Sequence, residues 1–179
     1  MARGAKISRE DLLAAAEQLV LAKGAAALTI GALAAEAGVS KGGVQTMFGT
    51  KEALVLDLVQ RWLDREQAEF REALTDQPNP TLAHIDQTRR LDEASHGKLA
   101  ALLAVASHSP AHTGMSQAWY AERTNRFEAN TAAERQERLA FLATEGAYFL
   151  RFLVGIPFDD DAWREMFEDI RTLAATARD

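Results

Sequence analysis

Apolar residues recur along this chain every three or four positions, which is the spacing of amphipathic helices. Leu12, Leu13, Ala16, Leu19 and Val20 show the pattern, because all five fall on one face of a helix. Alternating, strand-like runs are almost absent, and the abundant alanine, leucine, glutamate and arginine favour the helix. The chain is therefore predicted to be all-α, with about nine helices.

Short polar residues and glycines divide this pattern into separate helices. Ser8 is expected to cap the first helix, and Gly24 to end it. Thr29, Ser40 and Thr50 stand at the corresponding capping positions before the next three helices. Further helices are predicted over about 51–74, 81–92, 99–106, 116–130, 131–154 and from 159 onward, with a loop at 94–97.

The composition is that of a folded protein without disulfides. Of the 179 residues 47% are hydrophobic, which argues against disorder, and the absence of cysteine excludes disulfides and thiolate metal sites. No apolar run reaches the roughly 18 residues that a membrane helix needs. No apolar segment typical of a secretion signal follows Arg3 and Lys6. We expect a cytoplasmic protein that has no membrane partner.

The charge of the chain is unevenly distributed. The net charge of −6 by itself argues against a nucleic-acid partner. Residues 1–52, however, carry six basic and five acidic side chains, whereas the remaining 127 residues carry 14 basic and 21 acidic ones. The acidity therefore lies in the C-terminal part, and the sequence is compatible with a basic face near the N-terminus.

The segment Thr29–Lys51 has the spacing of two short helices that cross at a steep angle. Gly38 can adopt the positive φ of the turn between them, and Val39 can fill the angle. The second helix is then expected to expose small polar side chains that fit a DNA major groove, with its N-terminal residues toward the bases. An ordinary helical hairpin with a glycine turn would show a similar pattern.

The residues around these two helices favour DNA binding over an ordinary hairpin. Thr50 and Lys51 stand at a new helix N-terminus, where free backbone N–H groups and the positive end of the helix dipole can hold a phosphate. Thr29 occupies the same kind of position on the other flank. Two phosphate contacts on either side of a groove-sized helix are a more specific arrangement than a hairpin requires.

Over about residues 8–56 the sequence resembles the TetR family of bacterial transcriptional regulators. The resemblance rests on the helix that opens at Thr29, the turn Ala37-Gly38-Val39-Ser40, and the run from Lys41-Gly42 through Phe48 to Thr50-Lys51-Glu52-Ala53-Leu54. It implies a helix-turn-helix DNA-binding domain over 1–52 and a helical ligand-binding and dimerisation domain over 53–179. The DNA-binding residues it implies are Thr29, Ser40, Lys41, Gly42, Gly43, Gln45, Thr46 and Lys51.

The chain departs from the family pattern at Gln45, and also at Thr46 and Met47, where members often have histidine or another large polar residue. Members usually carry an aromatic residue, often tyrosine, where this chain has Gln45. The Gln45 amide is expected either to replace the phosphate contact of that tyrosine or to bind an adenine edge, and Lys41 to contact guanine or phosphate. Gly42 and Gly43 would let the helix lie close to the DNA.

The segment Phe141–Ile156 is apolar on nearly all sides, so that as a helix it must be covered on both faces. A partner subunit can cover one face, although a central helix buried within one subunit would have the same composition. The resemblance implies a two-fold dimer built on the last two long helices. The residues expected at the dimer interface are Phe149, Phe152, Leu153, Trp163, Phe167 and Ile170.

The resemblance also implies a pocket for a small molecule inside the C-terminal domain, and loss of operator affinity when the pocket is filled. Most aromatic residues of this region are expected to form core. The residues expected to line the pocket are Trp62, Leu102, Leu103, His108, Met115, Trp119, Phe127 and Tyr148.

The sequence contains no motif for catalysis or for a cofactor, since both a glycine-rich phosphate loop and a GxSxG motif are missing. His108 and His112 have the i, i+4 spacing of metal ligands, but Pro110 between them favours loop histidines. Three aspartates at 159–161 fit a helix N-terminus. No catalytic residue, metal or cofactor is predicted.

The function that these features predict is that of a TetR-like repressor. It would bind a palindromic operator in double-stranded DNA as a homodimer, and an unidentified small-molecule effector would release it. Two alternatives are a helical protein-interaction module without DNA binding and a small helical enzyme.

Overall fold

The computed structural model describes residues 7–106, 109–124 and 128–175. Over these ranges the chain forms nine α-helices, one 3₁₀ turn (η1, Ala25–Ala27) and one π-helical turn (η2, Phe149–Val154), without strands, as the sequence predicts. The α-helices are α1 (Arg9–Lys23), α2 (Ile30–Glu36), α3 (Lys41–Phe48), α4 (Lys51–Asp76), α5 (Pro80–Arg89), α6 (Glu93–Ala106), α7 (Pro110–Arg123), α8 (Ala132–Tyr148) and α9 (Asp160–Ala175).

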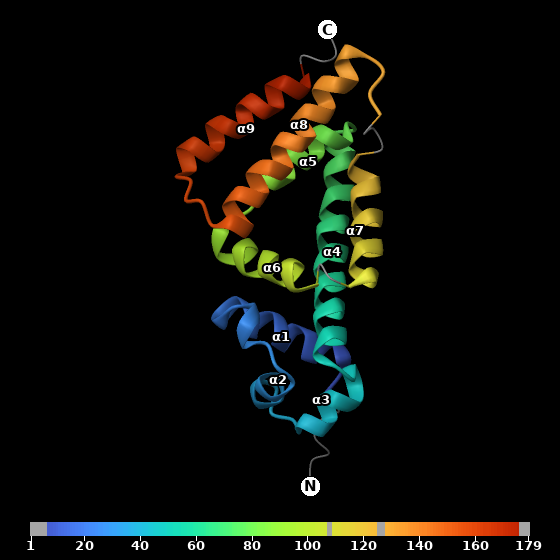
Figure 1. Ribbon diagram of the computed structural model, residues 1–179, viewed down its shortest axis with the longest axis vertical. Helices are drawn as coiled ribbons and strands as arrows, with labels where there is room; N and C mark the ends of the chain where they lie inside the picture. The colour runs from blue at the N-terminus through green and yellow to red at the C-terminus, as the bar shows by residue number, and fades with distance from the viewer. Residues whose placement is uncertain (1–6, 107–108, 125–127, 176–179) are drawn as a thin grey trace.

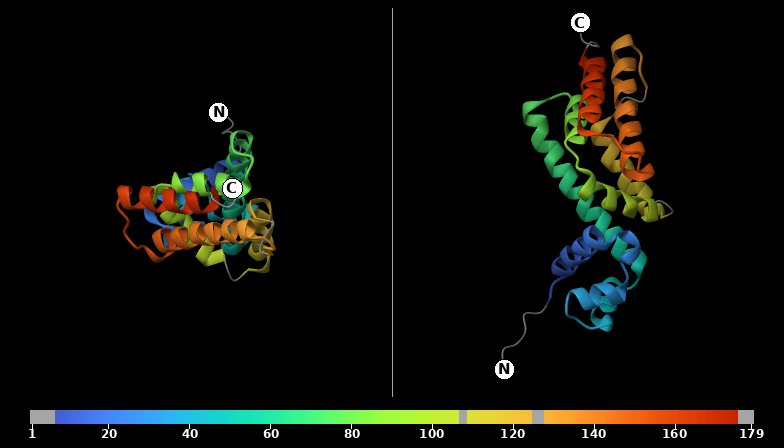
Figure 2. Two further views of the ribbon diagram at one scale, coloured as in Figure 1. Left: turned by 90° about the horizontal axis from the view of Figure 1, so that it is seen from above. Right: turned by 90° about the vertical axis from the view of Figure 1, so that its left-hand side faces the viewer.

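The helices form two unequal parts. In Figure 1, α1–α3 lie at one end, and the long α4 runs from them into a larger body built from the later helices. Within this body α7 packs along α4, and α9 packs against α5 and α8. Both views of Figure 2 also show α8 and α9 side by side. The long α4 is therefore a continuous connection between the two parts.

Each of the first four helices begins at the capping residue that the sequence predicts. Ser8 and Asp11 form a reciprocal capping box at the start of α1. The hydroxyls of Thr29, Ser40 and Thr50 accept hydrogen bonds from the backbone N–H three residues later, at 3.0, 3.1 and 3.1 Å. These bonds satisfy N–H groups that have no partner inside the helix. The local polar pattern thus fixes where these helices start.

Three later predictions about boundaries are wrong. Asn79 rather than Thr81 caps α5, because Pro80 fits the first helical position without losing a hydrogen bond. For the same reason Pro110 opens α7, which begins before the expected Ser116. The predicted loop at 94–97 is part of α6, a helix that packs against α1, α4 and η2. Burial of Leu99 and Leu102 on this helix outweighs the weak helix propensity of the residues before them.

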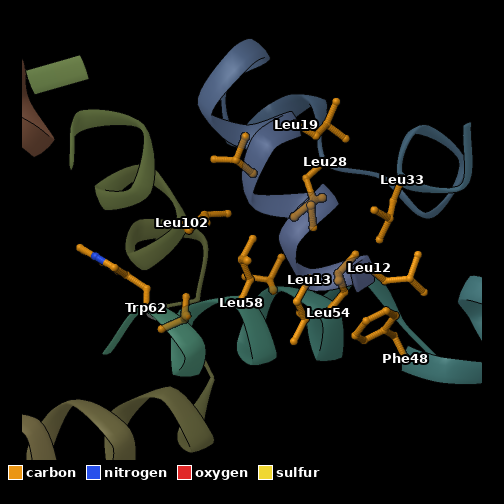
Figure 3. Packing of buried hydrophobic residues seen from close by; sticks show 14 of the residues in the cluster. Leu12, Leu13, Leu19, Leu28, Leu33, Phe48, Leu54, Leu58, Trp62 and Leu102 are labelled. Carbon is orange, nitrogen blue, oxygen red and sulfur yellow. The ribbon is translucent and has the colours of Figure 1, made fainter. Parts of the chain in front are cut away.

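The hydrophobic core has two clusters. The first joins the N-terminal helices to α4 and α6, and Figure 3 shows Leu12, Leu54 and Leu102 as members of this cluster from three of these helices. The second lies among α5, α8, η2 and α9, where Trp163 and Phe167 stack at 4.5 Å and Trp163 donates to the Arg89 carbonyl at 2.9 Å. Because α6 contributes to both clusters, the N-terminal helices rest directly on the larger body.

In the described part of the chain, no helix has the combined length and apolar character that crossing a bilayer requires.

Candidate nucleic-acid interface and ligand cavity

The turn between α2 and α3 has the geometry of a helix-turn-helix. Gly38 takes a φ of 66°, a left-handed conformation that costs glycine least. The N–H of Val39 then donates to the Ala34 carbonyl at 3.0 Å and closes the turn. Leu33 and Val44, one from each helix, are fully buried between them. This packing fixes α3 against α2 and leaves its other side free.

The free side of α3 is small and polar. Lys41, Gly42, Gly43, Gln45 and Thr46 are all exposed, whereas Val44 and Phe48 on the opposite side are buried. We call these five exposed residues the α3 face. The structure thus brings together, on one surface, the residues for which the sequence predicts contacts with bases.

Lys41 lies across the neighbouring helix α2. A Cβ atom placed on Gly31 would come within 2.7 Å of the Lys41 Cε atom, so glycine at this position leaves room for the lysine stem. The sequence analysis did not single out Gly31, because its role depends on a contact between two helices. The cation is thereby held at the start of α3.

The predicted phosphate-contact residues stand at the N-terminal ends of the helices before and after the α3 face in the chain. Thr29 and Ser40 are exposed N-caps, and Lys51 is half-buried at the first position of α4. The pKa of Glu52 is lowered because its carboxylate accepts hydrogen bonds from its own backbone N–H and from Thr50. The α4 N-terminus therefore already favours a negative charge, as expected from the helix dipole.

Ion pairs fix α1 and α3 against α4. Arg9 bonds to the Met47 carbonyl and to the Asp57 carboxylate, and its guanidinium lies 4.6 Å from the centre of the Phe48 ring. Arg65 on α4 pairs with Glu17 on α1 at 2.8 Å. These contacts join residues 38 to 48 positions apart, so no local pattern in the sequence indicates them. A movement of α4 would consequently carry the α3 face with it.

The larger body contains a cavity of about 240 Å³ beside α4. Four of the predicted pocket residues, Trp62, Leu103, Trp119 and Tyr148, line it. Leu102 instead lies in the first core cluster, and Met115 packs against that cluster. His108 and Phe127 lie outside the described residues. The other lining residues are Leu63, Glu66, His84, Gln87, Thr88, Leu91, His112, Ser116, Tyr120 and Glu145.

Glu145 on α8 has two partners in the cavity wall. It lies 2.6 Å from His84 Nε2 and accepts the Tyr120 hydroxyl at 2.5 Å. Burial raises the pKa of Tyr120, and the charge of Glu145 adds to the effect. His84 is buried on α5, and His112 lies within α7 rather than in the loop that the sequence predicted. The polar centre of the cavity, His84, Tyr120 and Glu145, was therefore not among the residues predicted from the sequence.

Glu66 on α4 is a second carboxylate in the wall, and it is buried. It accepts a hydrogen bond from Gln87 Nε2 at 3.0 Å and lies 3.4 Å from His96 Nε2. Arg123, fully buried, donates to the backbone carbonyl of Glu66 at 3.2 Å and stacks over Trp119 at 3.5 Å. Burial lowers the pKa of Arg123 to about 10, so the guanidinium keeps its charge at neutral pH.

The predicted dimer residues divide into two groups. Phe149 and Leu153 are 52% and 40% exposed on η2. Phe152, Trp163, Phe167 and Ile170 belong to the second core cluster, because packing among α5, α8 and α9 already covers them. Packing within one chain thus covers these four, and Phe149 and Leu153 are the exposed members of the predicted interface. The other exposed large apolar residues are Leu139, Leu142, Leu150, Val154 and Ile156.

Among the described residues no group of three or more histidine, aspartate and glutamate side chains could hold a metal ion.

Two protein-family comparisons cover most of the chain. Residues 12–58 match the family described as bacterial regulatory proteins, tetR family. Residues 78–175, more than half of the chain, match the Tetracyclin repressor-like C-terminal domain. No curated protein sequence is significantly similar to the chain.

Solved structures share the fold over nearly the whole chain. A transcriptional regulator from Rhodococcus sp. Rha1 superimposes with a TM-score of 0.72 at 20% identity, covering 95% of this chain and 97% of that one. A regulator from Streptomyces coelicolor A3(2) gives 0.65 at 22% identity, covering 93% and 97%. The multidrug binding protein EbrR, solved in complex with ethidium, gives 0.58 at 21% identity, covering 90% and 96%.

Proposed function

Because the chain belongs to the TetR family of bacterial transcriptional regulators, we propose that it is a repressor that binds a palindromic operator as a homodimer and is released by a small molecule. The family consists of DNA-binding regulators rather than enzymes, in agreement with the prediction that the chain has no catalytic residues. Membership of this family also argues against the alternative of a protein-interaction module without DNA binding.

The observation that carries the proposal is the position of the α3 face between two helix N-termini. Lys41, Gln45 and Thr46 are exposed on α3, and in the chain this helix stands between the capped starts of α2 and α4. Polar side chains on an exposed helix can read base edges, while N-termini and Lys51 hold the phosphates. The proposed DNA-binding domain spans residues 1–52, and the proposed sensing domain spans residues 53–179.

The exposed apolar residues of α8 and η2 support a homodimer. Leu142, Phe149 and Leu153 are each at least 40% exposed, which is unusual for large apolar side chains that lie close together in sequence. A second copy related by a two-fold axis would bury the same residues on both subunits. The dimer would then present two α3 faces to the DNA. To enter successive major grooves, these faces must be separated by about 34–36 Å, which is one helical turn of DNA.

The helix α4 offers a route from the cavity to the DNA. Its first residue is the proposed phosphate contact Lys51, and Trp62, Leu63 and Glu66 further along the same helix line the cavity. A ligand that displaces the cavity end of α4 would change the separation of the two α3 faces. EbrR, which has the same fold, is solved with imidazole, ethidium and proflavin, and this supports a small-molecule effector here.

The proposal is tested by gel shift with the DNA upstream of the protein's own gene, at two salt concentrations, against a scrambled duplex. Lys51→Ala should weaken binding about equally for all sequences and reduce the slope of log affinity against log salt by about 1. Lys23→Ala serves as the control, because Lys23 is exposed at the far end of α1. Absence of a specific shift, or equal behaviour of the two variants, would contradict the proposal.

A further inference from the structure

The cavity carries negative charge without a lining cation. Glu66 and Glu145 come from different helices, and no lysine or arginine is among the described residues that line the space. Arg123 is buried close by, but it bonds to the backbone carbonyl of Glu66 rather than to its carboxylate, and it also contacts Gln67 and Trp119. One guanidinium outside the lining therefore faces two carboxylates within it.

The histidines around the carboxylates orient them. His84 and His96 each present Nε2 to a carboxylate oxygen, at 2.6 Å from Glu145 and 3.4 Å from Glu66. Each ring donates its Nε2–H to the carboxylate that it faces, so that the two histidines fix the orientation of these carboxylates. Burial lowers the pKa of His112, so that this third histidine brings no positive charge near neutral pH. Among the described residues neither carboxylate forms an ion pair with a lysine or arginine, and a bound cation would supply this direct counter-charge.

The carboxylates of Glu66 and Glu145 both affect the same tyrosine in the cavity wall, Tyr148. The pKa of Tyr148 is raised by burial and then by the charges of Glu66 and Glu145, and that of Tyr120 by burial and then by Glu145. The two carboxylates thus give the aromatic wall a negative potential. An anionic ligand would be repelled there, whereas a cation would be attracted.

The aromatic residues of the walls also suit an aromatic ligand. Trp62 and His84 are 6% and 3% exposed, and Trp62 Nε1 and His84 Nδ1 have no hydrogen-bond partner among the described residues. The same holds for Trp119 Nε1, Tyr148 OH and Gln87 Oε1, which also belong to lining residues. In Figure 3 the Trp62 side chain extends away from the leucines of the first core cluster. Tryptophan and tyrosine faces attract organic cations in addition to burying apolar surface.

We propose that the effector is an aromatic organic cation whose positive charge lies between Glu145 and Glu66. The proposal rests on the cavity being the effector site of the proposed repressor. Glu145 would supply the closer counter-charge, since His84 and Tyr120 already fix its orientation. The apolar walls would select for ring size, and the two carboxylates for the sign of the charge.

The test uses three probes that share one ring system. N-methylacridinium carries a fixed positive charge, acridine is neutral at pH 8, and acridine-9-carboxylate is negative. Binding to the full-length protein is measured by titration calorimetry without DNA, because planar cations bind DNA themselves. N-methylacridinium should bind about tenfold or more tightly than acridine, and the carboxylate most weakly. Absence of N-methylacridinium binding, or equal binding of all three probes, overturns the proposal.

Two substitutions locate the charge. Glu145→Gln and Glu66→Gln should each weaken N-methylacridinium binding about tenfold and leave acridine binding almost unchanged. Glu69→Gln is the matched control, since Glu69 is exposed on α4 one turn from Glu66. Either cavity variant suffices if the other fails to fold. Equal losses for the cation and for neutral acridine would assign the glutamates a structural role and overturn the proposal.

The gel shift keeps this proposal separate from the proposed function. If the protein shifts its operator in the gel but binds the neutral or anionic probe more tightly, the proposed repressor function stands and the proposed cationic effector is refuted. A protein that binds N-methylacridinium through Glu145 but never shifts DNA refutes the repressor and retains the cation site.

Discussion

The α3 face and the cavity hold their polar groups in opposite ways. On the α3 face Lys41, Gln45 and Thr46 are exposed, so that water already solvates them. In the cavity Glu145 has two partners at 2.5 and 2.6 Å in a largely apolar wall. Exposed charges interact weakly and are screened by salt, whereas buried ones interact strongly and tolerate little misplacement. DNA binding should therefore depend on salt, and ligand binding on the position of individual buried groups.

The two regions also differ in what stabilises them. The ends of α1–α4 are defined by hydrogen bonds over three residues, while the body around the cavity is held by burial of rings from distant segments. Truncation of a buried ring should consequently cost far more than removal of a cap. The predictions that follow test this difference, from the largest expected effect to the smallest.

Phe167→Ala should give the largest loss. Phe167 is fully buried between Trp163 and the remainder of the second core cluster, so that truncation leaves a cavity. We expect a fall of about 3–5 kcal/mol in the free energy of unfolding, measured by urea denaturation. Glu165→Ala on the exposed side of α9 is the control and should change it by less than about 0.5 kcal/mol. A loss below about 1 kcal/mol for Phe167→Ala would contradict the burial argument.

How far the sequence predicts each region follows from the same difference. Ser8, Thr29, Ser40 and Thr50 were identifiable because a cap depends only on its neighbours in the chain. The contact between His84 and Glu145 joins residues 61 positions apart. A glutamate or histidine in a helical pattern is expected to be exposed unless the fold is known.

The aromatic residues fall between these two cases. Trp62, Trp119 and Tyr148 could be predicted as candidates, because large rings in helical stripes are usually buried. Whether a ring faces a cavity or a packed core depends on how the helices are arranged. Phe152, Trp163 and Phe167, chosen on the same grounds for the dimer interface, lie in the core instead.

Leu153→Asp should give the next largest effect, on assembly rather than on folding. Leu153 is 40% exposed on η2, next to Phe149 and Val154, so that a charge there would be buried in the proposed dimer. We expect the dissociation constant of the dimer to rise roughly 100-fold, measured by analytical ultracentrifugation. Ala118→Asp on the exposed side of α7 should leave it unchanged. A variant that stays dimeric at low concentration would place the interface elsewhere.

Ser40→Ala should have a smaller, local effect. The Ser40 hydroxyl accepts the Gly43 N–H at 3.1 Å at the start of α3. Its loss should lower the free energy of unfolding by about 1 kcal/mol, whereas Ser40→Gly should cost only a few tenths. If the alanine variant lost as much stability as Phe167→Ala, the contrast between local caps and long-range burial would fail.

The pH dependence of Asp11 should be the smallest effect. Hydrogen bonds from the Ser8 side chain and then from its backbone lower the pKa of Asp11, a fully exposed group. A carboxylate with a lowered folded-state pKa stabilises the fold above its unfolded-state pKa of about 3.9, and this contribution is lost as the pH falls through the folded value. The melting temperature of Asp11→Asn should therefore lie below that of the parent at neutral pH and converge with it below about pH 4. If the difference in melting temperature between the two proteins stayed constant across that range, the loss in Asp11→Asn would not come from the charge of the carboxylate.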